Sequence, residues 1–233
     1  MRVSELTWMQ LEAHLEHDDR IVLPLGTTEQ HAYLSLATDT IVAERLAVEA
    51  CEPLGIPVLP AMPYGCSPAF VAFPGTPSLR LETLVAVIRD AFDSLHRQGF
   101  RRFLVLDGHA GNTPAAGPLA EWARSREGAQ LIFHDWWTPA SVAAVIAAIG
   151  PDGSHSNWLE SLPWTRIEGI EPPTDRKPVI DDALVRDDDP EGNRRLLEDG
   201  SYGGVYRRSD EEMERLWAAA VAGVRHALEE GWA

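Results

Sequence analysis

The stretch Leu23-Pro24-Leu25-Gly26-Thr27-Thr28-Glu29-Gln30-His31 decides how this 233-residue chain folds. Its apolar part, residues 21–25, is typical of a buried parallel strand, and the polar residues follow where the strand ends. In open α/β sheets, ligands collect at the carboxyl ends of the strands. Glu29, His31 and the nearby Asp39 offer oxygen and nitrogen donors, a mixture that suits Zn²⁺ or Mn²⁺. The stretch therefore predicts a strand with a candidate metal site at its end.

Two further polar segments follow the same pattern. Residues 102–106 form a second apolar run, and it ends in Asp107-Gly108-His109-Ala110-Gly111-Asn112. The small residues around His109 let the backbone approach whatever this imidazole binds. The segment Gly153-Ser154-His155-Ser156-Asn157-Trp158-Leu159-Glu160-Ser161 adds another imidazole and another carboxylate. In a doubly wound sheet, such segments converge at one edge.

Apolar runs and amphipathic segments alternate along the chain, which predicts an α/β fold with a mainly parallel sheet. Further strands are expected at residues 56–60 and 129–137. Helices are expected at 3–17, from 40 for about three turns, at 79–99, from 113, at 139–149 and at 210–230. Residues 171–189, rich in proline and acids, are expected to be irregular. The length suits a single domain over residues 1–233.

The composition narrows the class of partner. The 36 acidic residues against 20 basic ones give a net charge of −16, which argues against nucleic acid and anionic membrane as partners. No apolar run approaches the roughly 20 residues of a membrane span, and residues 1–10 do not resemble a secretion signal. Two cysteines predict no disulfide framework. We therefore expect a cytoplasmic protein that acts on a small molecule.

Several motifs together resemble the creatininase (creatinine amidohydrolase) family. They are Thr28-Glu29-Gln30-His31, Thr38-Asp39-Thr40, Tyr64-Gly65, Phe73-Pro74-Gly75-Thr76 and Gly108-His109-Ala110-Gly111-Asn112. They occur in the family's order, extend to Ser161 and have a weaker echo at 200–204. The resemblance implies a three-layer α/β/α sandwich and a metal-dependent hydrolase. It also implies two divalent ions per chain, Zn or Mn with Fe as a further option, and a homo-oligomer, a hexamer by family likeness.

The resemblance also implies roles for individual residues. Glu29, His31, Asp39 and His109 match the family's metal ligands, with Asp39 at the position of the carboxylate that bridges both ions. Glu160, five residues after His155, matches the last ligand of the second ion. His155 and Glu160 are the expected catalytic pair, with His155 passing a proton to the leaving group or orienting the substrate. The candidate substrate contacts are Tyr33, Ser67, Phe70 and Trp158.

The departures from the family pattern concern the substrate. The first loop, Ala32-Tyr33-Leu34-Ser35-Leu36, lacks the family's second histidine, and Ala110 and Gly111 replace the tyrosine and glutamate of creatininase itself. Creatinine as a substrate does not follow. Hydrolysis of a C–N bond in a small polar cyclic amide or formamide is the common expectation. The form of the first loop also resembles the branch that contains 3-dehydro-scyllo-inosose hydrolase, which implies ring opening of a cyclic keto-polyol at a C–C bond.

Other interpretations of the same residues stay open at this point. Asp39 could cap the helix that follows it instead of binding metal. Cys66, beside the proposed site, could be a nucleophile, although most free cysteines pack as small hydrophobes. Residues 108–112 could form a phosphate loop, but they lack its glycine and lysine spacing. His155 and Glu160 could be structural only. A non-catalytic binding subunit with this fold is the remaining alternative.

Overall fold

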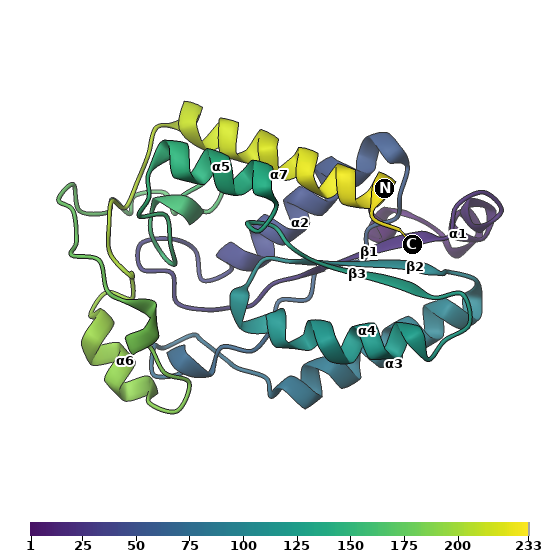
Figure 1. The fold of residues 1–233 in the computed structure, drawn as a ribbon, viewed down its shortest axis with the longest axis horizontal. Coiled ribbons are helices and arrows are strands. Elements are labelled where there is room, and N and C mark those ends of the chain that lie inside the picture. The colour runs from purple at the N-terminus through teal and green to yellow at the C-terminus, as the bar shows by residue number, and fades with distance from the viewer. Residues whose placement is uncertain (233) are drawn as a thin grey trace.

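A computed structural model describes residues 1–232, and a parallel sheet forms its centre (Figure 1). The strands are β1 (Arg20–Leu25), β2 (Arg102–Asp107) and β3 (Gln130–Asp135), in that spatial order. The register pairs Leu25 with Asp107, and Asp107 with Asp135, so all three carboxyl ends lie at one edge. The predicted parallel sheet is confirmed, and its carboxyl edge is where the polar segments begin.

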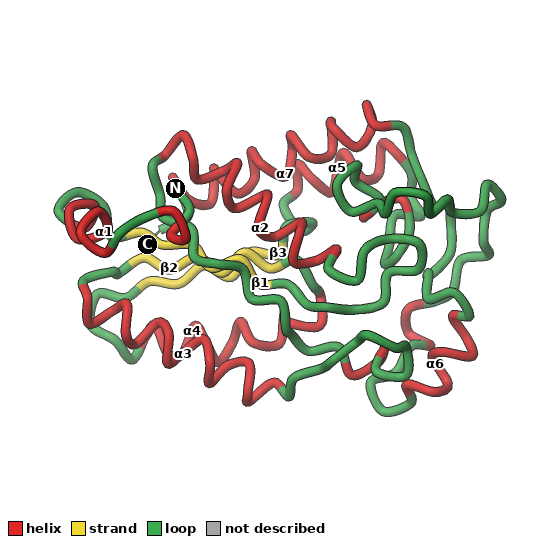
Figure 2. Tube along the Cα trace, turned by 180° about the vertical axis from the view of Figure 1, so that it is seen from behind, coloured by secondary structure: helices red, strands yellow, loops and turns green. Residues whose placement is uncertain are grey.

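Helices cover both faces of the sheet and complete three layers (Figures 1 and 2). One face carries α2 (Thr38–Cys51), α5 (Ala140–Ile149) and α7 (Asp210–Glu230), and the other carries α3 (Leu81–Gln98) and α4 (Ala116–Arg124). Successive strand residues point to opposite faces. Leu104 and Leu106 therefore pack with α2 and α7, whereas Phe103 and Val105 pack with α3 and α4. The α/β/α sandwich expected from the sequence is confirmed.

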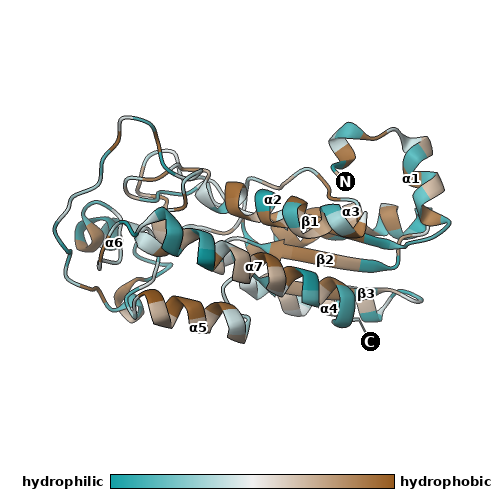
Figure 3. Ribbon diagram, turned by 90° about the horizontal axis from the view of Figure 1, so that it is seen from above, coloured by the Kyte–Doolittle hydropathy of each residue, from teal (hydrophilic) through white to brown (hydrophobic). Residues whose placement is uncertain are grey.

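The remaining elements are short. They are α1 (Trp8–Leu15), α6 (Pro190–Leu197) and the 3-10 turns η1 (Val3–Glu5), η2 (Glu52–Leu54), η3 (Pro68–Phe70), η4 (Ala110–Ala115), η5 (Trp158–Glu160) and η6 (Asp182–Leu184). The expected helix at 3–17 shortens to α1 because Thr7 and Gln10 form a capping box that starts it at Trp8. The expected helix at 210–230 coincides with α7, whose polar and apolar residues alternate along it (Figure 3).

The expected strand at 56–60 differs from the prediction. It joins the sheet beside β1 only through isolated bridges, Val22 with Val58 and Leu25 with Met62. Pro57 and Pro60 lack the N–H group that a regular ladder needs, which explains the irregular pairing. Among residues 1–232, the structure contains no helix long and apolar enough to cross a membrane.

Candidate metal centre

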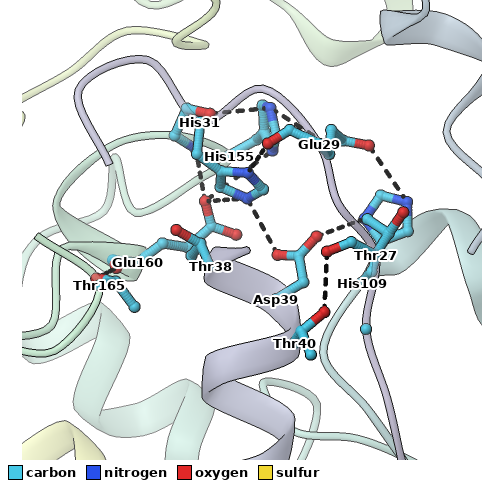
Figure 4. A network of polar contacts seen from close by, with 12 residues as sticks. Thr27, Glu29, His31, Thr38, Asp39, Thr40, His109, His155, Glu160 and Thr165 are labelled. Atoms are coloured by element: carbon cyan, nitrogen blue, oxygen red, sulfur yellow. Dashed lines mark hydrogen bonds and ion pairs between the residues drawn. The ribbon is translucent and has the colours of Figure 1, made fainter. Parts of the chain in front are cut away.

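Two glycines at the strand ends bring the polar segments together. A Cβ atom on Gly26, just after β1, would lie 2.4 Å from the Thr40 nitrogen, and one on Gly108, just after β2, would lie 2.3 Å from the Asp39 carbonyl oxygen. Only residues without a side chain let the first turn of α2 pack this closely against both strand ends. As a result, Asp39 projects between the loop after β1 and the loop after β2 (Figure 4).

Asp39 lies at the middle of the cluster. Its Oδ1 is 3.0 Å from Nε2 of His31, and its Oδ2 is 3.1 Å from Nδ1 of His109. Helix α2 begins at Thr38, with Ala37 at the N-cap position. Asp39 is therefore already inside the first helical turn, and its carboxylate faces the two imidazoles instead of capping the helix.

Three groups of donors could hold an ion, and two of them have Asp39 in common. The two that share Asp39 are Glu29, Asp39 and His109, and His31, Asp39 and Glu160, whereas the third is Glu29, His31 and His155. Within each group, the donor atoms lie within 4.8 Å of one another. Glu29 Oε2 is 3.4 Å from His109 Nε2, and Glu160 Oε2 is 3.5 Å from His31 Nε2. The structure thus brings all five predicted ligands together.

Backbone carbonyl groups orient both central imidazoles. Nδ1 of His31 lies 3.1 Å from the Glu29 carbonyl oxygen, and Nε2 of His109 lies 2.9 Å from the Cys66 carbonyl oxygen. A carbonyl only accepts, so each of these nitrogens carries the proton. The other nitrogens, Nε2 of His31 and Nδ1 of His109, face Asp39 and can donate lone pairs to a cation there once their protons leave. Metal-binding histidines usually donate their second N–H in this way.

Four of the five donors are buried, Glu160 is partly exposed, and several donor atoms lack partners. Glu29 is fully buried, and Asp39 is 3% exposed. Both carboxylate oxygens of Glu29, Oδ2 of Asp39 and Nε2 of His31 form no hydrogen bond of good geometry within residues 1–232. An unpaired buried charge costs several kcal/mol, so such a cluster needs a cation among its donors. Carboxylate oxygens and imidazole nitrogens are suitable donors for Zn²⁺ or Mn²⁺.

The same burial perturbs the titration of the cluster. Burial, with Asp39 close by, raises the pKa of Glu29 to about 7. Burial alone would lower the pKa of His109, but Glu29 and Asp39 raise it to about 10. Burial works to raise the pKa of Asp39, yet His31 and His109 hold it well below its ordinary value. Protons thus balance the charges of the cluster, and we expect cation binding to release them.

A hollow of about 980 Å³, here called the centre hollow, opens from the donors to the surface. Ser67 and Phe70, both predicted substrate contacts, line it, and Phe70 stacks on the ring of His155 with centroids 4.8 Å apart. Asp182 and Asp187 form part of its rim. The irregular segment 171–189 therefore borders the centre hollow.

Tyr33 and Trp158 are placed elsewhere. Ala32 has a φ of 49°, and the next residue, Tyr33, lines a separate hollow of about 350 Å³. There its ring meets Tyr206 edge-on at 5.4 Å. Trp158 is fully buried in the core, and its indole N–H donates to Asp152 over 3.2 Å. Neither side chain lines the centre hollow at the metal donors, in contrast to Ser67 and Phe70.

The structure also settles the character of Cys66. Its side chain packs in the core shared with α3 and α4, and burial raises the pKa of its thiol above the ordinary value. A buried thiol with a raised pKa is a poor nucleophile. The contribution of this residue to the site is its carbonyl oxygen, which accepts from His109.

Two residues of the site were not among the predicted ones. Tyr202 lines the centre hollow and meets the His155 ring at 5.0 Å, and its only sequence signal is the weak family echo at 200–204. Gln30 is 5% exposed, and its amide lies 2.8 Å from Nε2 of His155. Its position between two metal-donor residues was the signal that could have revealed it.

Comparisons with known proteins now bear on this geometry. Residues 4–228 match the family model Creatininase, described as creatinine amidohydrolase. The chain belongs to the creatininase family. The resemblance predicted from the sequence motifs is therefore confirmed over almost the whole chain.

Individual relatives are more distant. Creatinine amidohydrolase from Pseudomonas putida is 32% identical over 118 aligned positions; the match covers 48% of this chain and only 45% of that relative. Mycofactocin precursor peptide peptidase from Mycolicibacterium smegmatis is 31% identical over 177 aligned positions; the match covers 64% of this chain and 69% of that one. The 3-dehydro-scyllo-inosose hydrolase of Thermotoga maritima is 27% identical over 106 residues, 45% of this chain and 34% of that relative.

Solved structures agree on the fold. A crystal structure of creatinine amidohydrolase superposes with a TM-score of 0.76 over 99% of this chain and 97% of the other, at 23% identity. Similar structures include a manganese form of creatininase, with a TM-score of 0.73, and a mutant of Zn–Zn type, with a TM-score of 0.72. Both are 22% identical and cover 99% of this chain and 98% of theirs. At this identity, the likeness establishes the fold alone.

Proposed function

We propose that residues 1–233 form one metal-dependent hydrolase domain that cleaves a C–N bond of a small polar cyclic substrate, such as a cyclic amide or formamide. The observation that carries this proposal is the shared position of Asp39 between two buried donor groups. Glu29, Asp39 and His109 would hold one divalent ion. His31, Asp39 and Glu160 would hold the other. Zn or Mn suits these donors, with Fe as a further option.

The side chains around the donors divide the remaining work. When bound, divalent ions polarise a substrate carbonyl and lower the pKa of water toward neutrality. His155 lines the centre hollow, and its role is to hydrogen-bond the leaving group and orient the substrate there. Glu160 Oε2 lies 4.0 Å from Nδ1 of His155, beyond hydrogen-bond distance, so it acts on that imidazole through its charge. The Ser67 hydroxyl and the Phe70 ring offer a polar contact and an apolar wall to the substrate.

Retention of the buried donors favours an enzyme over a non-catalytic binding subunit. Glu29 and Asp39 sit in a site where an unpaired carboxylate costs several kcal/mol. A protein that only needed this fold for binding would be more stable with apolar residues at these positions. The polar cluster is therefore best explained by the chemistry that it supports.

A second candidate reaction is hydrolytic ring opening of a cyclic keto-polyol at a C–C bond. Residues 33–39, from the first loop to Asp39, have the form expected of the 3-dehydro-scyllo-inosose hydrolase branch, and that enzyme of Thermotoga maritima is among the relatives. The relative named as a peptidase adds peptide amides to the bonds worth testing. All three reactions would use the same donors, so they differ in the substrate and not in the metal centre.

We propose further that the protein is a homo-oligomer, a hexamer by family resemblance, and that it acts in the cytoplasm. The family match and the Trp-rich second half of the chain support association. Cys51 and Cys66 are both buried free thiols, which suits a reducing compartment.

The test is a metal-loading experiment followed by a substrate screen. The protein is loaded with Zn²⁺ or Mn²⁺ and incubated with cyclic amides, formamides, lactones, short peptides and cyclic keto-polyols, and products are followed by mass spectrometry. We expect about two ions per chain and the addition of one water to a cyclic amide or formamide. A protein that stays metal-free in excess Zn²⁺ and Mn²⁺ would overturn the proposal. Water addition to keto-polyols alone would establish the second candidate instead.

A further inference from the structure

Gln30 is a buried amide that links three distant parts of the chain. It lies between the metal donors Glu29 and His31 and is 5% exposed. Its side chain reaches His155, 125 positions along the chain, and the backbone of Gly200, 170 positions along. A buried amide with such contacts orients the groups that it touches.

Two backbone groups fix the orientation of this amide. Its Nε2 lies 3.0 Å from the Gly200 carbonyl oxygen, which can only accept, and its Oε1 lies 3.2 Å from the Ala32 N–H, which can only donate. The amide nitrogen therefore lies on the side of Gly200, because a flipped amide would place its oxygen against the Gly200 carbonyl oxygen. The second hydrogen of Nε2 is left for Nε2 of His155, 2.8 Å away.

The ring of His155 is held as firmly as the amide that meets it. Phe70 stacks on one face with an interplanar angle of 19°, and Tyr202 packs edge-on with ring centroids 5.0 Å apart. The hydroxyl of Ser156 lies 3.0 Å from the same Nε2 and can also donate to it. Glu29 Oε1, at 3.6 Å, is beyond hydrogen-bond distance of this nitrogen.

From this geometry we infer that Gln30 is a positioning residue, which holds His155 with Nε2 as the hydrogen-bond acceptor and the ring proton on Nδ1. Two consequences follow. The lone pair of Nε2 is engaged by the amide, so His155 does not bind metal through it, although this nitrogen lies 3.6 Å from Oε1 of Glu29. The neutral ring then offers its Nδ1–H to a leaving group as a hydrogen-bond donor. This second consequence rests on the proposed function, whereas the tautomer itself does not.

NMR reads the tautomer directly. The zinc-loaded protein is labelled with ¹⁵N-histidine, long-range ¹H–¹⁵N spectra are recorded, and the His155 signals are assigned by their loss in His155→Gln. We expect the Nδ1–H form of His155 to dominate in the wild type and to lose this dominance in Gln30→Met. In Gln30→Glu we expect the Nε2–H form, because a carboxylate accepts a hydrogen bond from that nitrogen. An Nε2–H form in the wild type, or an unchanged Nδ1–H form in Gln30→Met, would overturn the inference.

A second variant displaces the Gln30 amide while the side chains of Gln30 and His155 themselves stay unchanged. Gly200 has a φ of +98°, and a Cβ atom there would lie 1.7 Å from Oε1 of Gln30. Gly200→Ala should therefore displace the amide and weaken the Nδ1–H form as Gln30→Met does. The matched control is Gly169→Ala, which has a similar φ of +78° but no atom within 4 Å of the added Cβ among the described residues. Equal spectra for these two alanine variants would contradict the inference.

The outcomes separate this inference from the proposed function. If the protein takes up no zinc, the proposed function fails, and the spectra of the zinc-free protein still decide the tautomer. If the protein binds two ions and adds water to a substrate while His155 keeps its proton on Nε2, the proposed function stands and the role of Gln30 is wrong.

Discussion

Replacing the carboxylate that both donor groups share should remove both metal ions in one step. Asp39→Asn keeps the size of the side chain, and Asn can still hydrogen-bond to the imidazoles, so we expect the fold to survive. In the wild type, Oδ1 of Asp39 lies 3.0 Å from Nε2 of His31, and Oδ2 of Asp39 lies 3.1 Å from Nδ1 of His109. Loss of a residue that merely orients a ligand weakens metal binding by about 10–100-fold. Loss of a ligand common to two sites should cost at least roughly 100-fold at each.

The stabilisation by zinc gives the size of the effect. At a zinc concentration of about 100 times Kd, each site adds about 2.7 kcal/mol to the free energy of unfolding, and two sites add about 5 kcal/mol. For a chain of this length, 1 kcal/mol corresponds to roughly 2–4 °C. Zinc should therefore raise the wild-type unfolding midpoint by roughly 10–20 °C. At the same concentration, Asp39→Asn should gain under about 1 kcal/mol, which is a shift of a few degrees.

The assay combines thermal unfolding with equilibrium dialysis and metal analysis. The matched control is Asp135→Asn, because Asp135 ends the neighbouring strand at the same sheet edge but belongs to neither donor group. This control should keep both ions and the full zinc shift. Two ions per chain in Asp39→Asn, at the wild-type affinity, would refute the shared role of this carboxylate.

Three further predictions concern separate parts of the structure. Glu160→Gln and Glu29→Gln should each leave about one ion per chain in dialysis, since each change empties one donor group, and retention of both ions would count against the pairing. Trp158→Ala should lower the free energy of unfolding by about 3–5 kcal/mol in chemical denaturation but leave the metal content unchanged; a lost ion would place this core residue at the site. Asp93→Asn should cost about 1 kcal/mol or less at neutral pH, because the screened Arg126 pair holds the pKa of Asp93 at about 2. This difference in the free energy of unfolding should have its full size above about pH 3.9, the pKa of an unfolded Asp, and should vanish as the pH falls toward about 2. A difference that does not depend on pH would contradict the prediction, and Asp90→Asn is the control.

Local patterns predicted most of the fold. The apolar run at 21–25 became β1, and the stripe at 210–230 became α7, because both follow from side-chain periodicity alone. The eight-residue helix α6 was missed within a polar, proline-rich region where apolar periodicity is weak. The expected strand at 56–60 failed to form a regular ladder because its prolines remove donors, a cost that an apolar run does not reveal.

In the candidate site, the sequence predicted the metal donors but not the positions of the side chains around them. The five donors Glu29, His31, Asp39, His109 and Glu160 were predicted because strand ends converge and their motifs match a family. Side chains next to those motifs depend on loop conformation, which the sequence does not reveal. The left-handed backbone of Ala32 precedes a tyrosine, Tyr33, that lines the other hollow, and the buried ring of Trp158 belongs to the core. The bond between Gln30 and His155 joins residues 125 positions apart and became visible only in three dimensions.

The most direct test of the metal centre is anomalous X-ray diffraction at the zinc edge from crystals of the zinc-loaded protein. We expect two peaks flanking Asp39. One should lie about 2.0–2.2 Å from donor atoms of Glu29, Asp39 and His109, and the other at the same distances from His31, Asp39 and Glu160. A single peak, peaks away from Asp39, or a peak bound by Nε2 of His155 would contradict this account of the site.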